Sequence, residues 1–235
     1  MRKPENIKKK NRSIPVIEGN NELKLRVRRI IRLLKTEFPE AKTALIFSNP
    51  LQLLISTILS AQCTDERVNK VTPLLFRKYK TARDFANANL MELESIIKST
   101  GFYRMKARNI IQTCRLLVNR FNGKVPKNMD DLLSLPGVGR KTANCVLGGA
   151  YGIQSGFVVD THVKRISKRL GLTKNDDPKK IEMDLISIIP RKEWYNMSNL
   201  MILHGRKTCR ARNPLCDRCI LAPLCPSAFS FSKLR

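Results

Sequence analysis

The stretch Leu135-Pro136-Gly137-Val138-Gly139-Arg140-Lys141-Thr142 joins two segments with helical character, at residues 130–134 and 141–151. Two glycines within three residues allow backbone conformations that other residues avoid, and they keep bulky side chains away from the start of the second helix. Exposed amide groups at a helix N-terminus can bind a phosphate oxygen. The stretch therefore predicts a helical hairpin that presents a helix N-terminus to a phosphate-bearing partner.

The charge of the whole chain also favours a polyanionic partner. The 235 residues include 45 Lys and Arg against 19 Asp and Glu, which gives a formal net charge of +26. Phosphate neutralisation and counterion release favour nucleic acid, while an anionic membrane surface and ribosomal RNA remain alternatives. The chain is long enough for one large domain or two modest lobes with a hydrophobic core.

The ends of the chain carry no sign of a membrane or export signal. No run of about 18 apolar residues predicts a membrane span, and the basic first residues lack the apolar segment of a secretory signal. We therefore expect a cytoplasmic, nucleoid-associated protein. Residues 1–21 are polar and include Lys8-Lys9-Lys10, which predicts a basic disordered tail that either tethers DNA or is only solvated. Residues 229–235 are expected to form a second tail.

Helical periodicity accounts for most of the remaining chain. Apolar residues recur at helical spacing at residues 22–38, 51–61, 65–79, 90–99, 106–121, 163–170, 178–188 and 194–205, in addition to the two hairpin segments. Asn49 and Pro50 are suited to cap and begin the second of these helices. Because no alternating pattern predicts a strand, the expected class is all-α.

Lys141 and Asp160 are the candidates for chemistry. Lys141 lies in the first turn of the second hairpin helix beside Arg140, where the helix dipole and the guanidinium both favour the free amine. A free amine can attack a sugar C1′ and form a Schiff base, although a lysine in this place is often only a phosphate contact. Asp160 follows the apolar run Phe157-Val158-Val159, either as a helix N-cap or as an acid of the site.

Four of the seven cysteines crowd the C-terminus with the spacing C-x6-C-x2-C-x5-C; they are Cys209, Cys216, Cys219 and Cys225. Four thiolates in so short a segment can surround one metal centre. A four-cysteine zinc site usually pairs two C-x2-C units, and only one is present, so an iron–sulfur cluster is favoured and zinc is the alternative. Arg210 and Arg212 lie between the first two cysteines, so metal binding would fold a basic loop suited to phosphate contact.

Taken together, these motifs resemble those of the endonuclease III family of helix-hairpin-helix DNA glycosylases. The motifs are Gly137-Val138-Gly139-Arg140-Lys141, Val158-Val159-Asp160-Thr161-His162, residues 59–65, 101–106 and 202–206, and the cysteine spacing. The resemblance implies an all-α, two-lobed fold with a C-terminal [4Fe–4S] cluster loop. A six-helix lobe would cover residues 43–152, with the hairpin at about 130–151. Residues 22–42 and 153–228 would form the second lobe, with the cluster loop at 209–225.

The resemblance also implies a function: a base-excision repair DNA glycosylase that removes oxidised or damaged pyrimidines from double-stranded DNA. A monomer suits this way of binding DNA. An associated AP lyase activity would cut 3′ to the abasic site. By this resemblance Lys141 attacks C1′, Asp160 assists, and the four cysteines hold a [4Fe–4S] cluster. Gln62 would fill the space left by the extruded nucleotide, and Phe102 would wedge the opposite strand, where many bacterial members carry a leucine. The expected DNA contacts are Gly137, Val138, Gly139, Arg140, Arg210 and Arg212.

Rival functions differ at single positions. Adenine-removing relatives carry a catalytic glutamate in the early helix, and residues 51–61 contain no carboxylate. Thymine-mismatch relatives commonly carry a tyrosine at the position of Lys141. Pyrimidine-dimer glycosylases also use this lysine and stay open as an alternative. A non-catalytic DNA-binding module is a different class of answer, and the pair of Lys141 and Asp160 argues against it.

Overall fold

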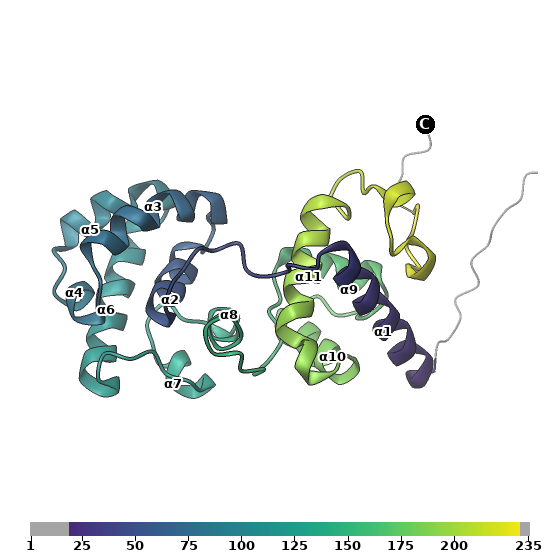
Figure 1. Ribbon diagram of the computed structural model, residues 1–235, viewed down its shortest axis with the longest axis horizontal. Helices are drawn as coiled ribbons and strands as arrows, with labels where there is room; N and C mark the ends of the chain where they lie inside the picture. The colour runs from purple at the N-terminus through teal and green to yellow at the C-terminus, as the bar shows by residue number, and fades with distance from the viewer. Residues whose placement is uncertain (1–18, 231–235) are drawn as a thin grey trace, which may run out of the picture.

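The protein, described by a computed structural model over residues 19–230, consists of helices joined by loops (Figure 1). No strand occurs anywhere in that range, so the predicted all-α class is confirmed. The first 18 residues of the predicted basic tail and residues 231–235 lie outside the described part. Residues 20 and 21, which were expected in the tail, already belong to the first helix.

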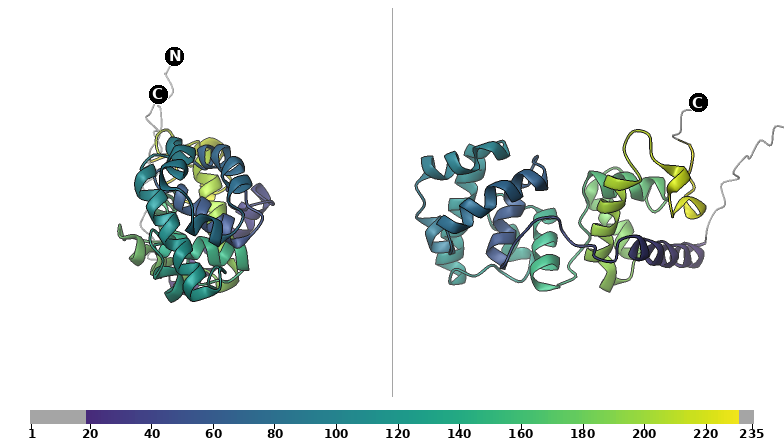
Figure 2. Two further views of the ribbon diagram at one scale, coloured as in Figure 1. Left: turned by 90° about the vertical axis from the view of Figure 1, so that its left-hand side faces the viewer. Right: turned by 45° about the horizontal axis from the view of Figure 1, so that its top comes forward.

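Two hydrophobic cores divide the molecule into two lobes. One core is built from residues between 45 and 147, and the other from residues 27–34 together with residues between 157 and 221. The lobes lie end to end along the long axis, and the chain passes between them before α2 and again after α8 (Figures 1 and 2). We call the lobe around the first core the hairpin lobe and the lobe around the second core the cysteine lobe.

The hairpin lobe contains the helices α2 (Pro50–Leu59), α3 (Asp65–Lys78), α4 (Ala82–Ala86), α5 (Leu90–Ile97), α6 (Tyr103–Phe121), α7 (Met129–Leu133) and α8 (Arg140–Tyr151), with the 3₁₀ turn η1 (Lys98–Thr100) after α5. Helices α4 and α5 pack on α6, and α2 packs on α8. Helix α2 begins as predicted, because the Asn49 side chain accepts a hydrogen bond from the Gln52 amide and Pro50 occupies the first position.

Between residues 43 and 152 there are seven α-helices, one more than the six expected. The additional helix is α4, whose five residues are too few for an apolar repeat to be visible. It forms because Thr81 and Asp84 make a capping box, in which each side chain accepts a hydrogen bond from the other residue's amide. A local capping signal therefore decides this helix.

The cysteine lobe contains α1 (Asn20–Glu37), α9 (Thr161–Arg169), α10 (Pro178–Ile188) and α11 (Trp194–Lys207), with the 3₁₀ turns η2 (Arg191–Glu193), η3 (Cys216–Arg218) and η4 (Ala222–Leu224). Helix α1 buries Val27, Ile30, Ile31 and Leu34, which form one apolar stripe, and packs against α10 and α11. The N-terminal helix thus completes a lobe whose other parts all follow residue 152. Within residues 19–230, no helix has the length and apolar character needed to cross a membrane.

Candidate active site and cysteine loop

A cleft of about 590 Å³ lies between the two lobes and is lined by both. The hairpin lobe contributes Gln62 from the loop after α2 and Lys141 from the start of α8. The cysteine lobe contributes Asp160 from the start of α9 and Arg206 from α11. The structure therefore brings together the three predicted site residues Gln62, Lys141 and Asp160, which are up to 98 positions apart in the sequence.

The hairpin turn has the geometry that its two glycines suggest. Gly137 has a φ of +75°, and a Cβ at this position would lie 2.8 Å from the Asn109 Nδ2 atom, so only glycine fits without rearrangement. Gly139 is the N-cap of α8 and faces open space, and no side chain caps the helix. The amides of the first turn of α8 are therefore open to an anion. The Val138 side chain is buried, so only its backbone can reach such a partner.

Lys141, the second residue of α8, is exposed in the cleft. Its ammonium group forms no hydrogen bond or ion pair with any residue in the described range 19–230. A lysine side chain has three donors on a flexible stem. With none of them engaged, the Nζ atom is free to approach a group that enters the cleft.

Arg140, the neighbour of Lys141, is held by Glu182 of α10. Its Nε and Nη2 atoms donate to the two carboxylate oxygens of Glu182 at 2.6 and 3.1 Å, and this bond raises the pKa of Arg140. Glu182 is buried and also accepts from Asn144 Nδ2 at 3.0 Å and from the Phe157 amide at 3.3 Å. One carboxylate thus ties the hairpin helix to α10 and to the segment that leads to Asp160. The use of Arg140 as a DNA contact stays a prediction.

Asp160 caps α9. Its Oδ1 atom accepts a hydrogen bond from the Val163 amide at 2.8 Å, and its backbone is extended, as an N-cap requires. The second carboxylate oxygen makes no hydrogen bond within the described residues. Upstream, the Val158 amide donates to the Ser198 Oγ atom at 3.0 Å, which fixes the segment against α11. The cap therefore orients the carboxylate on the wall of the cleft, and one oxygen stays available.

Gln62 and Phe102 share an unusual backbone conformation. Their φ angles are +51° and +47°, in the left-handed region that non-glycine residues seldom adopt. Both side chains are exposed, and Phe102 is 62% exposed, so it is not a core residue. Gln62 lines the cleft, whereas Phe102 lies outside the cleft lining, at the N-terminus of α6. Asn122, Asn213 and Phe229 have the same left-handed backbone, so this conformation alone does not distinguish the two residues; what distinguishes Gln62 is its place in the cleft lining.

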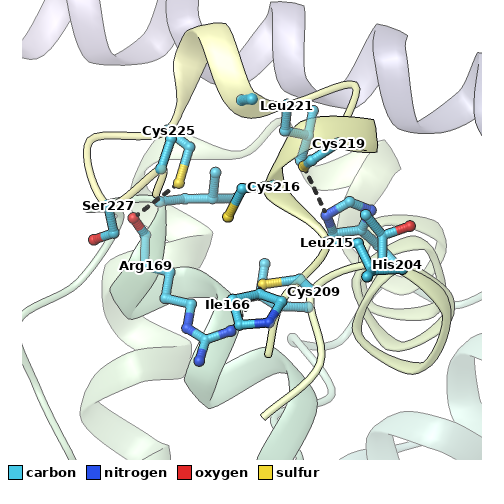
Figure 3. Close-up of a pocket in the computed structure, with 15 residues that line it drawn as sticks. Ile166, Arg169, His204, Cys209, Leu215, Cys216, Cys219, Leu221, Cys225 and Ser227 are labelled. Atoms are coloured by element: carbon cyan, nitrogen blue, oxygen red, sulfur yellow. Dashed lines mark hydrogen bonds between the residues drawn. The ribbon is translucent and has the colours of Figure 1, made fainter. Parts of the chain in front are cut away.

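The four C-terminal cysteines surround one small cavity, shown in Figure 3. The cavity has a volume of about 30 Å³, and its wall includes the apolar side chains of Ile166, Leu170, Leu215 and Leu221. The Cys219 Sγ atom lies 3.6 Å from the His204 Nε2 atom, and Cys225 Sγ lies 3.4 Å from the Arg169 carbonyl oxygen (Figure 3). The loop contains only two short 3₁₀ turns, so its backbone has little regular structure of its own.

Two arginines of α9 hold the start of this loop, and sequence reasoning missed both. Arg165 donates to the Cys209 carbonyl at 3.0 and 3.2 Å. Arg169, one helical turn later, donates to the Arg210 and Ala211 carbonyls at 2.7 and 3.0 Å and to Cys209 Sγ at 3.3 Å. The predicted contact residues Arg210 and Arg212 remain exposed. Their side chains therefore point outward from a loop whose backbone is anchored from behind.

The four cysteine side chains are better suited to bind a cationic group than to remain as free thiols beside one another. Burial raises the pKa of the Cys219 thiol to about 11 and also raises the pKa of Cys225. Four thiolates in an apolar cavity would repel one another, and the loss of water disfavours each charge. A bound cationic group reverses this balance because metal ligation keeps thiols deprotonated. The donor set and the apolar wall thus suit a thiolate-ligated metal group.

Further residues of the cleft were not predicted. Arg206 of α11 forms an ion pair with Asp65 of α3 at 2.7 Å, which links the two lobes. His162 also lines the cleft, and burial lowers its pKa, an effect opposed by the charge of Asp160. Both residues lie inside motifs that were singled out in the sequence, but their partners are remote in the chain. Only the fold shows which charge each one meets.

Comparison with known proteins agrees with this geometry. The family model for "HhH-GPD superfamily base excision DNA repair protein" matches residues 55–191. Endonuclease III of Synechocystis sp. is 56% identical over 205 residues, 87% of this chain and 94% of that protein. Endonuclease III of Bacillus subtilis is 44% identical, over 80% of this chain and 86% of that protein. A solved structure of a trapped endonuclease III–DNA covalent intermediate is similar with a TM-score of 0.83 and 46% identity, over 87% of this chain and 96% of that one.

The fold and the cleft thus define a helix-hairpin-helix base-excision DNA repair protein. Within that superfamily, the chain belongs to the endonuclease III family. The predicted class of activity, a DNA glycosylase with AP lyase activity, and the prediction of DNA binding are confirmed by this membership. The two-lobed helix-hairpin-helix fold is confirmed as well.

Proposed function

We propose that this enzyme excises damaged pyrimidines from duplex DNA with Lys141 as its nucleophile and with the carboxylate of Asp160 assisting it. The observation that carries the proposal is that these two residues line one cleft from opposite lobes. The similar structure of a trapped endonuclease III–DNA covalent intermediate supports a covalent mechanism. An exposed lysine without an internal partner is suited to that step.

The chemistry follows from an amine nucleophile. The Lys141 amine attacks C1′ of the extruded nucleotide, the bond from C1′ to the base breaks, and the base leaves with a proton. Opening of the sugar gives an imine between Nζ and C1′. The imine acidifies C2′, so loss of a C2′ proton breaks the bond from C3′ to the 3′ phosphate oxygen. Water then releases the lysine.

Asp160 supports this sequence in two ways. Its carboxylate stabilises the positive charge that grows on the sugar as the base departs. Its oxygen that makes no hydrogen bond within residues 19–230 can accept the proton of the attacking amine and return it later. Because Oδ1 is occupied by the Val163 amide, the helix cap keeps the carboxylate in place during both steps.

The remaining predicted residues are proposed as DNA contacts. Extrusion of a nucleotide costs a few kcal/mol, least for a damaged base. The strained, exposed positions of Gln62 and Phe102 support their insertion into the two strands. The uncapped N-terminus of α8, with the Gly137–Gly139 backbone and Arg140, is suited to a phosphate, as are Arg210 and Arg212.

We also propose that Cys209, Cys216, Cys219 and Cys225 hold a [4Fe–4S] cluster. A single zinc ion needs its sulfur ligands at about 2.3 Å from one point, and within residues 19–230 no three His, Cys, Asp or Glu side chains lie close enough together to bind one ion. The four cysteines line one cavity, and their spacing, C-x6-C-x2-C-x5-C, supports a cluster held by all four. When bound, the cluster supplies structural support to the basic loop.

The unit of function is proposed to be a monomer that acts on DNA inside the cell. One chain provides both Lys141 and Asp160 to the same cleft, so no second copy is needed to complete the site. The lobe boundaries at residues 43–152 and at residues 22–42 with 153–228 are proposed on the same basis, because each lobe has its own core.

The experiment that tests the proposal traps the imine. The protein is incubated with duplex DNA that contains one thymine glycol, borohydride is added, and covalent complexes are separated on a denaturing gel. Lys141→Ala is compared with Lys42→Ala, which removes the same charge from an exposed lysine of the same cleft. We expect trapping by the wild-type protein and by Lys42→Ala, and none by Lys141→Ala.

Other substrates separate the remaining alternatives. If an abasic duplex traps but thymine glycol does not, the lyase is supported and the lesion is a different one, with a pyrimidine-dimer duplex as the next substrate. If both duplexes bind and neither traps, the catalytic role of Lys141 is wrong. In that case the protein binds DNA but does not form the proposed covalent intermediate.

A further inference from the structure

Lys106 is a buried lysine of the hairpin lobe that the proposed chemistry does not use. It lies in α6, in the segment 101–106, and only 4% of its surface is exposed. Its ammonium donates to the Leu59 carbonyl at 2.7 Å and to the Thr100 carbonyl at 2.8 Å. Among residues 19–230, no carboxylate pairs with it.

The two acceptors explain how a cation can be buried without a counter-ion. Leu59 is the last residue of α2, and Thr100 is the last residue of η1. Carbonyls at helix C-termini lack helical partners and carry partial negative charge. Burial lowers the pKa of Lys106, and a neutral amine would still supply one N–H to each carbonyl. The side chain therefore caps two helices at once.

Both capped helices lead directly into the strained positions. Gln62 follows Leu59 by three residues, and Phe102 follows Thr100 by two. The Lys106 amide also donates to the Phe102 carbonyl at 3.1 Å. One residue thus bonds to the base of both loops, although the loops are about 40 positions apart, at residues 62 and 102.

We infer that Lys106 is a positioning residue that fixes the spacing between Gln62 and Phe102, so that both side chains enter the duplex together. The inference rests on the DNA-insertion roles proposed above for these two residues. Extrusion needs the vacated space to be filled while the opposite strand is wedged. Loops that move independently would each have to be ordered when DNA binds, which weakens the extruded complex.

The test compares two DNA substrates that differ in the free energy needed to extrude the damaged nucleotide. One duplex has thymine glycol opposite adenine, and the other has the same lesion opposite a stable abasic analogue, where no base pair must be broken. Single-turnover excision is measured for the wild-type protein, for Lys106→Met and for Lys98→Met. Lys98 is exposed in η1, so its substitution removes the same charge beside the same loop.

We expect Lys106→Met to lower the excision rate mainly for the lesion that is opposite adenine. Lys106→Met should slow excision of the paired lesion about tenfold more than excision of the unpaired lesion, a barrier change of about 1.4 kcal/mol. Lys98→Met should change both rates by the same factor. Thermal unfolding of each variant identifies the folded fraction, and a loss of folded protein alone would lower both rates equally.

Other outcomes would overturn the inference about Lys106 or the proposed lesion specificity on which it rests. An unchanged ratio of the two rates in folded Lys106→Met would show that Lys106 is only a structural residue. If Lys106→Met does not fold, Lys106→Gln is used instead, because it keeps a donor for one of the carbonyls. The ratio of the excision rates for the paired and unpaired lesions then tests the inference. If the wild-type protein excises neither lesion, the proposed lesion specificity fails, and Lys106 is then tested by the rates of abasic-site cleavage with and without an opposite base.

Discussion

The cleft and the cysteine loop are built in opposite ways. The cleft presents its reactive groups from helix ends, with Asp160 bonded as a cap and Lys141 in the first turn after an uncapped N-terminus. The cysteine loop has two 3₁₀ turns and is anchored by side chains of neighbouring helices: by Arg165 and Arg169 at its start and by Arg26, which donates to the Leu224 carbonyl at 3.2 Å, near its end. The reactive groups of the cleft are thus positioned by helix ends, whereas the loop is held by side chains of other elements and by the group that its thiols would bind. The contrast predicts that damage to the cleft removes activity, and damage to the loop removes structure.

The largest expected effect is in the cleft. Lys141→Arg keeps the positive charge but removes the nucleophile, because arginine stays protonated. Single-turnover cleavage of an abasic duplex should fall by roughly a thousandfold or more, while the DNA dissociation constant and the melting temperature stay near those of the wild-type protein. Substantial cleavage by the arginine variant would mean that Lys141 is only a phosphate contact.

The second effect is in the loop and should appear as lost structure. Cys219→Ala removes one of four ligands, and metal binding by such a site is coupled to folding. We expect loss of iron and of visible absorbance, with a lower free energy of unfolding because the ligand no longer stabilises the folded loop. Cys63→Ala, in the hairpin lobe, is the control and should keep both signals. A stable Cys219→Ala protein that still binds DNA tightly would show that the loop folds without its ligand.

The third effect lies at the junction between the lobes. Glu182→Gln removes the charge that pairs with Arg140 while it keeps the size of the side chain. The expected loss of stability is about 1.5–3 kcal/mol, as for a hydrogen bond to a charged group. Urea denaturation measures it, with the exposed Glu40→Gln as the control. An unchanged midpoint would mean that α8 and α10 are held by apolar packing alone.

The smallest effect is a change in stability at Asp160, and it separates the role of this residue as a helix cap from its role in excision. Asp160→Asn keeps an oxygen that can accept from the Val163 amide, so stability should change little, whereas Asp160→Ala should lose about 1 kcal/mol with the cap. Excision by both variants should be strongly reduced, because neither has a carboxylate. The assays are thermal unfolding and single-turnover excision. Full activity of the asparagine variant would reduce Asp160 to a helix cap.

Much of the fold was predictable because its signals are local. Asp177 and Pro178 mark the start of α10, and its predicted bounds match those observed. Helix α4 was missed because its signal is a capping box and not an apolar repeat. Phe102 was proposed as a wedge by resemblance, but its left-handed backbone and exposure became visible only in the structure.

The supporting residues of the site were not predictable in the same way. Glu182 and Arg140 are 42 positions apart, and Lys106 and Leu59 are 47 apart. No local pattern encodes such pairs, because each depends on how complete helices pack. One clue was available in hindsight: a carboxylate beside Ile181 on the buried face of α10 requires a partner. Sequence motifs thus identify the candidate reactive residues, whereas the residues that position them are set by the packing of the helices.

The position of α1 has a consequence for how the molecule is made. Helix α1 is synthesised first, yet its apolar stripe packs against α10 and α11, which are synthesised last. Domains fold as units while the chain emerges from the ribosome. The hairpin lobe has all its helices by residue 152 and can fold early, whereas the first helix must wait with its apolar face uncovered. The cysteine lobe can therefore be completed only after α10 and α11 have been synthesised.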